Sequence, residues 1–389
     1  MKILLANFTK MINDSGGTAK VNCAFANEMV RRGNEVAMVY SDDREGEFFF
    51  PVDNAVRCWN LRRYNGKVQK LPFSYRLRRE LVRGFSKKLA ATINEDFTAK
   101  YLTQNAAAIL EEFKPEVIIC FQPAAAKVYL CDLKTKIPVI LMAHGDTEDW
   151  FHYYPEEQIP AIRDSRVVQV LVPSFVQPVT SRLPNTKTVV IGNVVPQFEP
   201  IDLATKGGPH KILFIARLAK NHKRPHLLIE AFCRIADRFP DWSVEIWGAE
   251  DTRGYKKEMQ ATIDKAGLTS RIKLMGTTKE VEKVLSEGDL FVFPSAAEGF
   301  SLAVTEAMSK GLPAVVCRNC SALNEIVEDG KTGFLAAADP ADIAEKMVII
   351  MSDTAKRAEM GRNAHEAVKQ YAADIIWGKW IKLLAEVTG

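Results

Sequence analysis

The chain has 389 residues, 47% of them hydrophobic and 26% charged, with a formal net charge of +4. This composition is ordinary for a globular protein, and the length predicts two domains of about 190 residues each. No apolar stretch approaches the roughly 20 residues of a membrane span. Asn7, Lys10 and Asn13 interrupt the first apolar run, which predicts a short strand rather than a secretory signal.

Seven cysteines are scattered along the chain, mostly within apolar runs. An odd and scattered set is typical of a reducing compartment, so we expect a cytoplasmic protein. Cys317 and Cys320 form a CxxC pair, but no second pair or histidine cluster accompanies them. We therefore expect buried or loop thiols and no metal site.

Short apolar runs alternate with helical patterns through both halves of the chain, as expected for parallel strands covered by helices on both faces. The expected strands are residues 2–7, 35–40, 117–121, 139–144, 169–174, 188–192, 211–217, 243–248, 272–276, 290–295, 313–317 and 333–337. A stretch rich in proline and glycine, 195–211, separates the halves. The pattern predicts an α/β chain of two Rossmann-like, doubly wound domains, 1–195 and 209–371, which face each other across a cleft.

Glu298 and Glu306 flank a short apolar run in the second half. Eight residues rotate a helix roughly 80° beyond two full turns, so the two glutamates would not share one helix face. Residues 289–295 are typical of a buried strand and residues 302–310 of a helix, with Ser301 as its expected N-cap. Glu298 is then expected in the loop after the strand, and Glu306 inside the helix.

Between the two glutamates, the amides of Gly299, Phe300 and Ser301 are expected to point outward with the positive end of the helix dipole. A ligand that fits these features carries phosphate in its middle and a hydroxyl-bearing group at each end. A nucleoside-diphosphate sugar has this layout. The alternative is that both glutamates are ordinary solvated residues.

Two further features are compatible with a phosphate ligand. Gly16 and Gly17 follow the first expected strand and begin a helix that ends near Gly33, and a glycine pair allows close approach to phosphate. Arg217 is expected to end a strand, and Lys223 follows six residues later. Two cations at the mouth of a sheet can neutralise a diphosphate. A simple turn and surface basicity remain the alternatives, and the missing GxGxxG fingerprint disfavours a dehydrogenase.

The segments "ARL" with the following lysine, "FPSAAEGFSLAVTEAMSKGLPAVV" and "NEIVEDGKTGFL", with the early Gly-Gly loop, occur in a characteristic order. In this order they are similar to the retaining glycosyltransferases known as family 4, of the GT-B fold. The resemblance covers nearly the whole chain and is clearest over residues 212–339. Ser321 and Ala322 stand where the family often has Gly-Gly, and Val194 follows Asn193 where it often has glycine, so the loop shape and the donor sugar are open.

The resemblance implies roles for individual residues. Arg217 and Lys223 would hold the donor diphosphate, Glu298 the sugar hydroxyls and Glu306 the ribose diol. The implied catalytic residues are His144, Arg217, Lys223 and Glu298. The implied donor-binding residues are Gly16, Gly17, Arg217, Lys223, Gly248, Met275, Glu298, Gly299, Phe300, Ser301, Leu302 and Glu306. In such folds a carboxyl-terminal helix, here 372–389, packs back on the first domain.

The implied reaction transfers a hexose from a nucleoside-diphosphate sugar to a hydroxyl of a glycan or lipid-linked acceptor, with retention and without a metal or other cofactor. Its expected setting is the synthesis of cell-surface polysaccharide or glycoconjugate. An epimerase or phosphorylase of the same fold, and a non-catalytic nucleotide-sugar binding subunit, remain alternatives. The donor base, UDP or GDP, its sugar, the acceptor and the oligomeric state are open.

Residues 62–88 carry ten lysines and arginines against one acid, Glu80, and Leu, Phe and Tyr are interleaved with them. Such a stretch can lie on an anionic membrane surface or meet an anionic acceptor, with Tyr75, Leu77, Leu81 and Phe85 as apolar anchors. A solvated helix face and a nucleic-acid surface are the alternatives, and no nucleic-acid motif supports the latter. We therefore expect a cytoplasmic protein that can associate with the inner face of the membrane.

Overall fold

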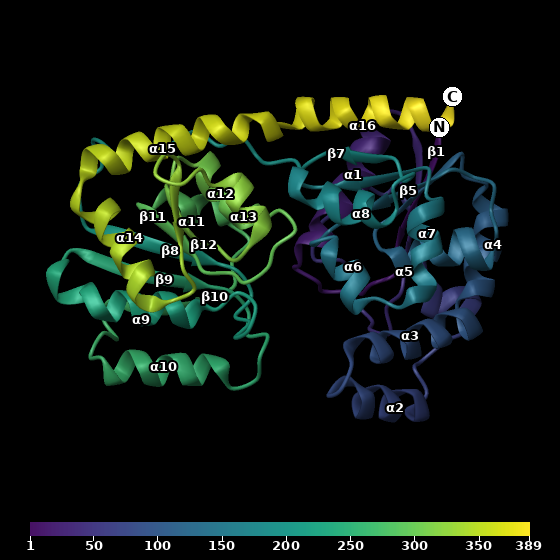
Figure 1. Ribbon diagram of the computed structural model, residues 1–389, viewed down its shortest axis with the longest axis horizontal. Coiled ribbons are helices and arrows are strands. Elements are labelled where there is room, and N and C mark those ends of the chain that lie inside the picture. Colours follow the sequence, from purple (N-terminus) through teal and green to yellow (C-terminus); the bar gives the residue numbers. More distant parts are fainter. The chain divides into compact units, whose positions relative to one another are not determined.

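The apolar runs form two parallel sheets, one in each of two units (Figure 1). The computed structural model describes residues 1–389, apart from the side chain of Lys87. The first unit comprises Met1–Ile191 with Gly378–Gly389, and the second comprises Gly192–Trp377. Among the described residues, no helix is long and apolar enough to cross a membrane.

The first unit holds a seven-stranded parallel sheet with the strand order β3-β2-β1-β4-β5-β6-β7. Every residue of β4, β5 and β6 is buried, which requires helices on both faces of the sheet. The strands are β1 (Lys2–Asn7), β2 (Glu35–Tyr40), β3 (Arg57–Asn60), β4 (Val117–Cys120), β5 (Val139–Met142), β6 (Val167–Val170) and β7 (Thr188–Val190). The α-helices are α1 (Gly17–Arg31), α2 (Phe73–Arg83), α3 (Lys87–Tyr101), α4 (Thr103–Phe113), α5 (Pro123–Lys127), α6 (Glu148–Tyr153), α7 (Ile159–Asp164) and α8 (Val176–Arg182).

The second unit holds a six-stranded parallel sheet with the order β10-β9-β8-β11-β12-β13. Its strands are β8 (His210–Ile215), β9 (Trp242–Trp247), β10 (Ile272–Gly276), β11 (Leu290–Phe293), β12 (Ala314–Cys317) and β13 (Gly333–Ala336). Its α-helices are α9 (Pro225–Ile235), α10 (Tyr255–Lys265), α11 (Val281–Ser286), α12 (Leu302–Ser309), α13 (Ser321–Ile326), α14 (Pro340–Ser352) and α15 (Thr354–Val368).

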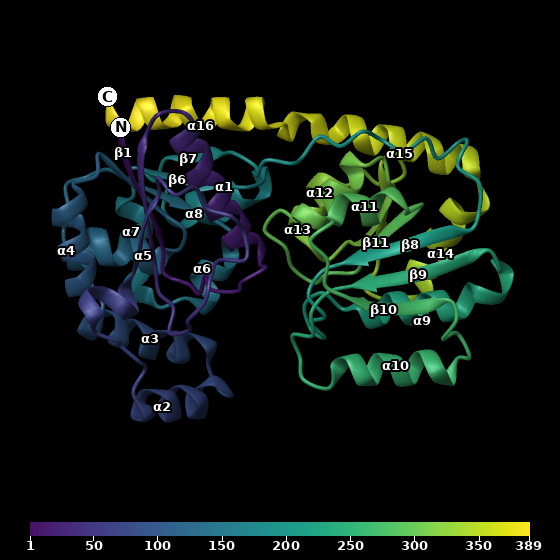
Figure 2. The same ribbon diagram turned by 180° about the vertical axis from the view of Figure 1, so that it is seen from behind.

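The last helix, α16 (Ala373–Thr388), begins in the second unit and ends in the first (Figure 2). In the first unit, its Trp380 ring meets the Phe25 ring edge-on, with the ring centroids 4.9 Å apart. Lys187 and Glu386 form an ion pair of 3.3 Å in the same unit. Trp377 and Trp380 are both buried, so the tryptophans of this helix are packing residues.

The α/β class and the two Rossmann-like sheets are confirmed, and strands β1, β2 and β10 occupy the predicted ranges. One local prediction was wrong, and one strand was missed. The strand predicted over 169–174 is β6, Val167–Val170, because the chain leaves the sheet before the 3₁₀-helix Pro173–Phe175 and the polar Gln169 is buried inside the strand. Strand β3 was missed because its sequence, Arg-Cys-Trp-Asn, has no apolar run.

Each sheet has a switch point, where the chain reverses the direction in which it adds strands. In the first sheet this point lies between β1 and β4, and in the second it lies between β8 and β11. Ligands of such sheets bind at the carboxyl ends of the strands beside the switch point. The loops that follow β1, β4, β8 and β11 are therefore the places to look for a site.

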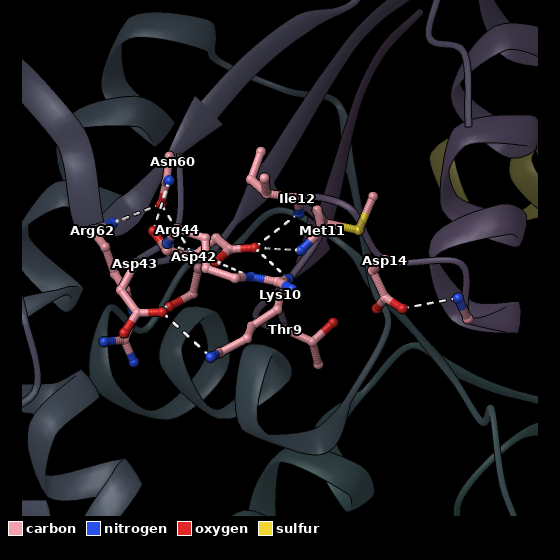
Figure 3. A network of polar contacts seen from close by, with 12 residues as sticks. Thr9, Lys10, Met11, Ile12, Asp14, Asp42, Asp43, Arg44, Asn60 and Arg62 are labelled. Carbon is pink, nitrogen blue, oxygen red and sulfur yellow. Dashed lines mark hydrogen bonds and ion pairs between the residues drawn. The ribbon is translucent and has the colours of Figure 1, made fainter. Parts of the chain in front are cut away.

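The loop after β1 is tied to the loop after β2 through a buried carboxylate (Figure 3). Asp42 accepts hydrogen bonds from the backbone amides of Met11, at 2.9 Å, and Ile12, at 2.8 Å. The guanidinium of Arg44 donates to the same carboxylate at 2.9 and 3.0 Å. Asp14 then accepts from the Gly16 amide at 2.8 Å. This network fixes the path of the chain from β1 into the Gly-Gly start of α1.

The Asp42 network predicts an acid-sensitive contribution to stability. Burial opposes the Asp42 charge, but the hydrogen bonds from Arg44, Ile12 and Met11 outweigh it and lower its pKa to about 2. A lowered carboxyl pKa stabilises the fold above the ordinary value near 4, and this gain, about 2 kcal/mol, is lost as pH falls to about 2. We expect Asp42→Asn to reduce the free energy of unfolding at pH 7. The difference from the unchanged chain should shrink below pH 4, as measured by urea unfolding.

Candidate functional site

The loops that follow β8 and β11 are bonded to each other, because these two strands are neighbours in the sheet. The Ala296 amide donates to the His222 carbonyl at 2.8 Å. The Nε2 of His222 donates to the Ala297 carbonyl at 2.6 Å. Arg224 reaches the Pro294 carbonyl at 2.8 Å through its Nε. Backbone acceptors in one loop thus fix the position of the other loop.

Lys223 and Glu298, one from each loop, form an ion pair. Their side chains are only 13% and 9% exposed, so water screens the two charges weakly. The Lys223 ammonium also lies 5.3 Å from the centre of the Phe293 ring, and the Ser295 hydroxyl donates to the Glu298 carboxylate. The structure therefore brings together two residues that the sequence predicted at one site.

Arg217 lies two residues beyond the end of β8, not at its end as predicted. Its guanidinium forms an ion pair with Asp251 at 2.8 Å, and both side chains are about half exposed. An exposed pair of this kind contributes at most about 1 kcal/mol, so an anionic ligand can replace Asp251 at low cost.

The start of α12 differs from the prediction at Ser301. Ser301 occupies the position before the helix, but its side chain makes no capping hydrogen bond, because the residue has a φ of 60° in the left-handed region. Its hydroxyl is buried and has no hydrogen-bond partner among the described residues. The amides of Gly299, Phe300 and Ser301 likewise donate no hydrogen bond to any of the residues that the structure describes. These donors suit an anion or a sugar oxygen.

Glu306 lies inside α12, as predicted, and the structure shows that it is buried. Leu302 begins the same helix, and the preceding Phe300 is buried against Tyr371, with the ring centroids 4.8 Å apart. The structure thus places one carboxylate in the loop and the other on the helix, on either side of the unbonded amides. A ligand with phosphate between two hydroxyl-bearing groups matches that order.

Gly248 and Met275 lie at the ends of the neighbouring strands β9 and β10. Gly248 leaves no room for a side chain, since a Cβ there would lie 1.8 Å from the Ala216 carbonyl oxygen. The backbone at Gly248 therefore packs directly against the backbone at Ala216, in the loop after β8. Met275 is exposed at the end of β10, where its thioether can cover a flat ring.

In the first unit, His144 follows β5 and stacks on Phe121, with the ring centroids 4.9 Å apart and the planes 10° from parallel. Burial lowers the pKa of His144 to about 4, so the ring is neutral at pH 7. Its Nε2 is buried without a partner among the described residues. Gly16 precedes α1, and a Cβ on Gly17 would meet open space. His144, Gly16 and Gly17 stay predicted site residues.

Sequence reasoning missed several polar residues at these strand ends. His222 and Arg224 join the two loops of the second unit, and in the first unit Asn7 accepts a hydrogen bond from Gln122. Asn7 is the last residue of β1, and Gln122 lies two residues beyond β4; these strands flank the switch point. A search for polar residues at or near the carboxyl ends of neighbouring strands would have found both.

A pocket of about 550 Å³ in the first unit was also missed, because its walls come from separate segments. Arg44 and Arg63 lie beside Glu45 and Tyr64 in its lining, together with Trp59. Arg63 pairs with Glu45 at 2.9 Å, so cations and acids balance there. Such a lining can bind a hydroxyl-bearing ligand through both donors and acceptors.

Cys317 and Cys320 are free, buried thiols. Burial raises the pKa of each to about 11, so both are protonated at neutral pH. Among the described residues, no three His, Cys, Asp or Glu side chains gather in a way that could hold a metal ion.

The close approach at Gly248 generates a prediction. We expect Gly248→Ala to force the loops after β8 and β9 apart and to lower the free energy of unfolding by about 2 kcal/mol or more, since the added carbon meets backbone that cannot move freely. Urea unfolding measures this change. Gly207→Ala is the matched control, because a Cβ at Gly207 meets no atom within 4 Å. Equal stability of the two variants would contradict the steric account.

Residues 209–353 match the family model described as "Glycosyl transferases group 1". A D-inositol 3-phosphate glycosyltransferase of Corynebacterium urealyticum is 28% identical over 45% of this chain and 41% of the relative. A protein of Haemophilus influenzae described as an uncharacterized glycosyltransferase is 21% identical over 97% of this chain and 98% of the relative. The chain spans less than half the length of the first four curated relatives it matches.

Solved structures match the whole chain. HepE of Anabaena, solved with UDP and glucose, has a TM-score of 0.70 and 20% identity, and the match covers 99% of both chains. A mutant of TarM from S. aureus, solved with UDP and α-GlcNAc-glycerol, has a TM-score of 0.74 and 15% identity, over 98% of this chain and 99% of TarM. At these identities the likeness shows the fold. Together, these matches show a whole chain of the GT-B fold, with a segment at residues 209–353 that is similar to the glycosyl transferases group 1 model.

Proposed function

We propose that the chain transfers a hexose from a nucleoside-diphosphate sugar to a hydroxyl of a glycan or lipid-linked acceptor, with retention of the anomeric configuration. The observation that carries the proposal is the ion pair of Lys223 and Glu298 beside the unbonded amides of residues 299–301. A cation, a carboxylate and free N–H donors lie together at the switch point of the second sheet. A sugar linked to a diphosphate needs each of these groups.

The diphosphate is assigned to Lys223 and Arg217. Lys223 is largely withdrawn from water, so its charge acts on a phosphate with little screening. Arg217 is exposed and bound only to an exposed aspartate, so it is free to turn toward the ligand. The α12 dipole and the amides of residues 299–301 add positive potential at the same place.

The two glutamates are assigned to the two rings of the donor. When a phosphate pairs with the Lys223 ammonium in place of Glu298, the Glu298 carboxylate can accept hydrogen bonds from sugar hydroxyls. The unpartnered Ser301 hydroxyl lies beside it in the sequence and can donate to a sugar oxygen. Glu306 is assigned to the ribose diol, and Gly248 with Met275 to the base.

The proposed reaction is a substitution on one face of the sugar. The bond from the anomeric carbon to the phosphate oxygen breaks, and the acceptor oxygen attaches on the same face. The acceptor proton passes to the departing phosphate oxygen. Lys223, Arg217 and the amides stabilise the negative charge that develops on the diphosphate, so the proposal assigns no role to a metal.

The comparisons supply support at the level of chemistry. HepE is solved with UDP and glucose, and TarM is solved with UDP and α-GlcNAc-glycerol. Both proteins share this fold and bind a nucleotide together with a sugar compound. The proposed donor of this chain belongs to the same class, and its setting is the assembly of cell-surface polysaccharide or glycoconjugate.

The proposal predicts that one nucleoside-diphosphate sugar raises the melting temperature through binding to the native state. We expect Lys223→Ala to weaken that donor about 100-fold, because a charge-assisted bond to phosphate is lost. Glu306→Gln should weaken it about 10-fold while preserving side-chain volume. Thermal shift across a panel of UDP and GDP sugars measures both effects.

The control for these variants is Lys220→Ala. Lys220 lies three residues before Lys223, but it is half exposed and paired with Glu258, outside the assigned site. Each variant is also melted without ligand, which separates lost binding from lost folding. Near-normal donor affinity in both Lys223→Ala and Glu306→Gln would refute the site assignment.

Metal independence is a second prediction. Because Lys223, Arg217 and the helix amides are assigned to the charge of the leaving diphosphate, we expect the transfer rate to be unchanged by EDTA. The rate of nucleoside-diphosphate release with acceptor present, with and without chelator, measures this. A loss of turnover that added divalent ion restores would contradict the assignment of charge stabilisation to side chains alone.

A further inference from the structure

Helix α2 carries an apolar face that its own unit leaves uncovered. Phe73, Leu77 and Leu81 recur every four residues, so they lie on one face of the helix. Their exposed fractions are 78%, 50% and 62%. None of the eleven residues of α2, all described by the structure, is buried. An apolar stripe of this kind normally faces a core.

Two further side chains extend this apolar surface beyond the helix. Phe85, just after α2, is 94% exposed, and Leu89 in α3 is 57% exposed. Figures 1 and 2 both show α2 at the edge of the first unit, with α3 beside it. The apolar surface is therefore formed by Phe73, Leu77, Leu81, Phe85 and Leu89, and we call it the α2 face.

The other side of α2 is packed inward. Tyr75 meets Phe97 and Tyr101 edge-on, with ring centroids 6.3 and 6.4 Å apart. The prediction of Tyr75 as an apolar anchor was therefore wrong, because its ring belongs to the contact between α2 and α3. Leu77, Leu81 and Phe85 are exposed as predicted.

Arginines border the α2 face on both sides. At 100° per residue, Arg76 and Arg83 fall on one edge of the stripe and Arg78 falls on the other. Glu80 is engaged by Arg79 at 2.8 Å and by Arg83 at 3.7 Å. Within the part of the chain that the structure describes, Arg76 and Arg78 form no ion pair. Lys87, a further member of the basic stretch 62–88, has a side chain outside the described ones.

We propose that the α2 face docks on an anionic lipid membrane surface. The apolar side chains enter the boundary between headgroups and acyl chains, and Arg76, Arg78 and Arg83 contact lipid phosphates. This arrangement of an exposed apolar stripe with cations along its edges is the physical pattern of an interfacial helix. The charge favours lipid over a protein surface of mixed charge, and the inference does not depend on the transferase activity.

The charged and the apolar side chains of the α2 face contribute separately to its affinity for the membrane, so each contribution can be tested by its own variant. Each arginine near an anionic surface contributes about a fivefold gain in affinity. Replacing Arg76 and Arg78 together by glutamine should therefore weaken binding about 30-fold. Leu81→Ser removes apolar area that the membrane would bury and should weaken binding about 10-fold.

Co-sedimentation with vesicles tests the proposal, using phosphatidylcholine alone and phosphatidylcholine mixed with phosphatidylglycerol. We expect binding to the mixed vesicles at low salt, release on raising the salt, and little binding to neutral vesicles. The charge control is Lys256→Gln with Lys257→Gln on α10, and the apolar control is Ile375→Ser, also exposed. Both controls should bind like the unchanged chain.

Three results would overturn the proposal: no binding to the mixed vesicles at low salt, equal binding to neutral vesicles, or unchanged binding of the Arg76 and Arg78 double variant. Size-exclusion chromatography adds a fourth. If Leu81→Ser converted a dimer into a monomer, the α2 face would be a contact between copies of the chain. Donor-induced thermal shifts, measured on the same samples, report on the sugar-nucleotide site, so failure of one proposal is visible without failure of the other.

Discussion

The adjacency of β8 and β11 is the constraint on which the candidate donor site depends. Lys223, in the loop after β8, and Glu298, in the loop after β11, are 75 residues apart in the sequence. Parallel pairing brings the carboxyl ends of the two strands to the same edge of the sheet. Hydrogen bonds from His222 and Arg224 to carbonyls of the β11 loop then hold the two loops together. Backbone groups set the position of the charged side chains, so the site geometry does not rely on the ion pair alone.

The Lys223–Glu298 pair has a consequence for ligand binding. Two charges withdrawn from water gain little net stability from each other, because desolvation offsets much of their attraction. The pair is retained at a place where the Ser295 hydroxyl and the Phe293 ring also engage it. A ligand that offers an anion to Lys223 and hydroxyls to Glu298 replaces both partners at once, which leaves neither charge buried alone. A ligand with only one of these groups would leave either Lys223 or Glu298 buried without a partner of opposite charge or a hydrogen-bond partner.

The first unit also has a parallel sheet with a switch point, but the side chains beside it are different. Its switch point lies between β1 and β4, where Asn7 and Gln122 are hydrogen-bonded to each other. The loop after β1 is held by the Asp42 carboxylate, with a pKa lowered to about 2 by the bonds that outweigh its burial. His144, in contrast, is neutral at pH 7, since burial lowers the pKa of its ring to about 4. Asn7, Gln122 and His144 are therefore uncharged polar groups at this edge, and such groups suit hydroxyls.

The sequence predicted the strands that are continuous apolar runs and the loops that follow them, because burial on both faces leaves a direct mark on composition. It could not predict β3, which lies at the edge of the sheet and pairs only with β2. None of its four residues is buried, so the strand has no apolar run. The motif residues Arg217, Lys223 and Glu298 were found from charge and order. His222 and Arg224 were not, since they act through backbone carbonyls that lie some 70 residues away in sequence. Ser301 was assigned as a cap from its residue type, but its backbone is left-handed and its side chain makes no capping hydrogen bond.

Helix α2 is a case in which sequence pattern and packing give different information. An isolated helix of eleven residues is marginal in water, and most helices in proteins are stabilised by burying an apolar face. In α2 the inward contact is made by Tyr75, whereas the apolar residues at spacing four point away from the unit. Internal packing therefore explains why the helix forms against α3 but not why its outer face is apolar. The apolar outer residues therefore require a binding partner outside the described chain. Because arginines lie along both edges of the stripe, that partner must present a surface that is both apolar and anionic.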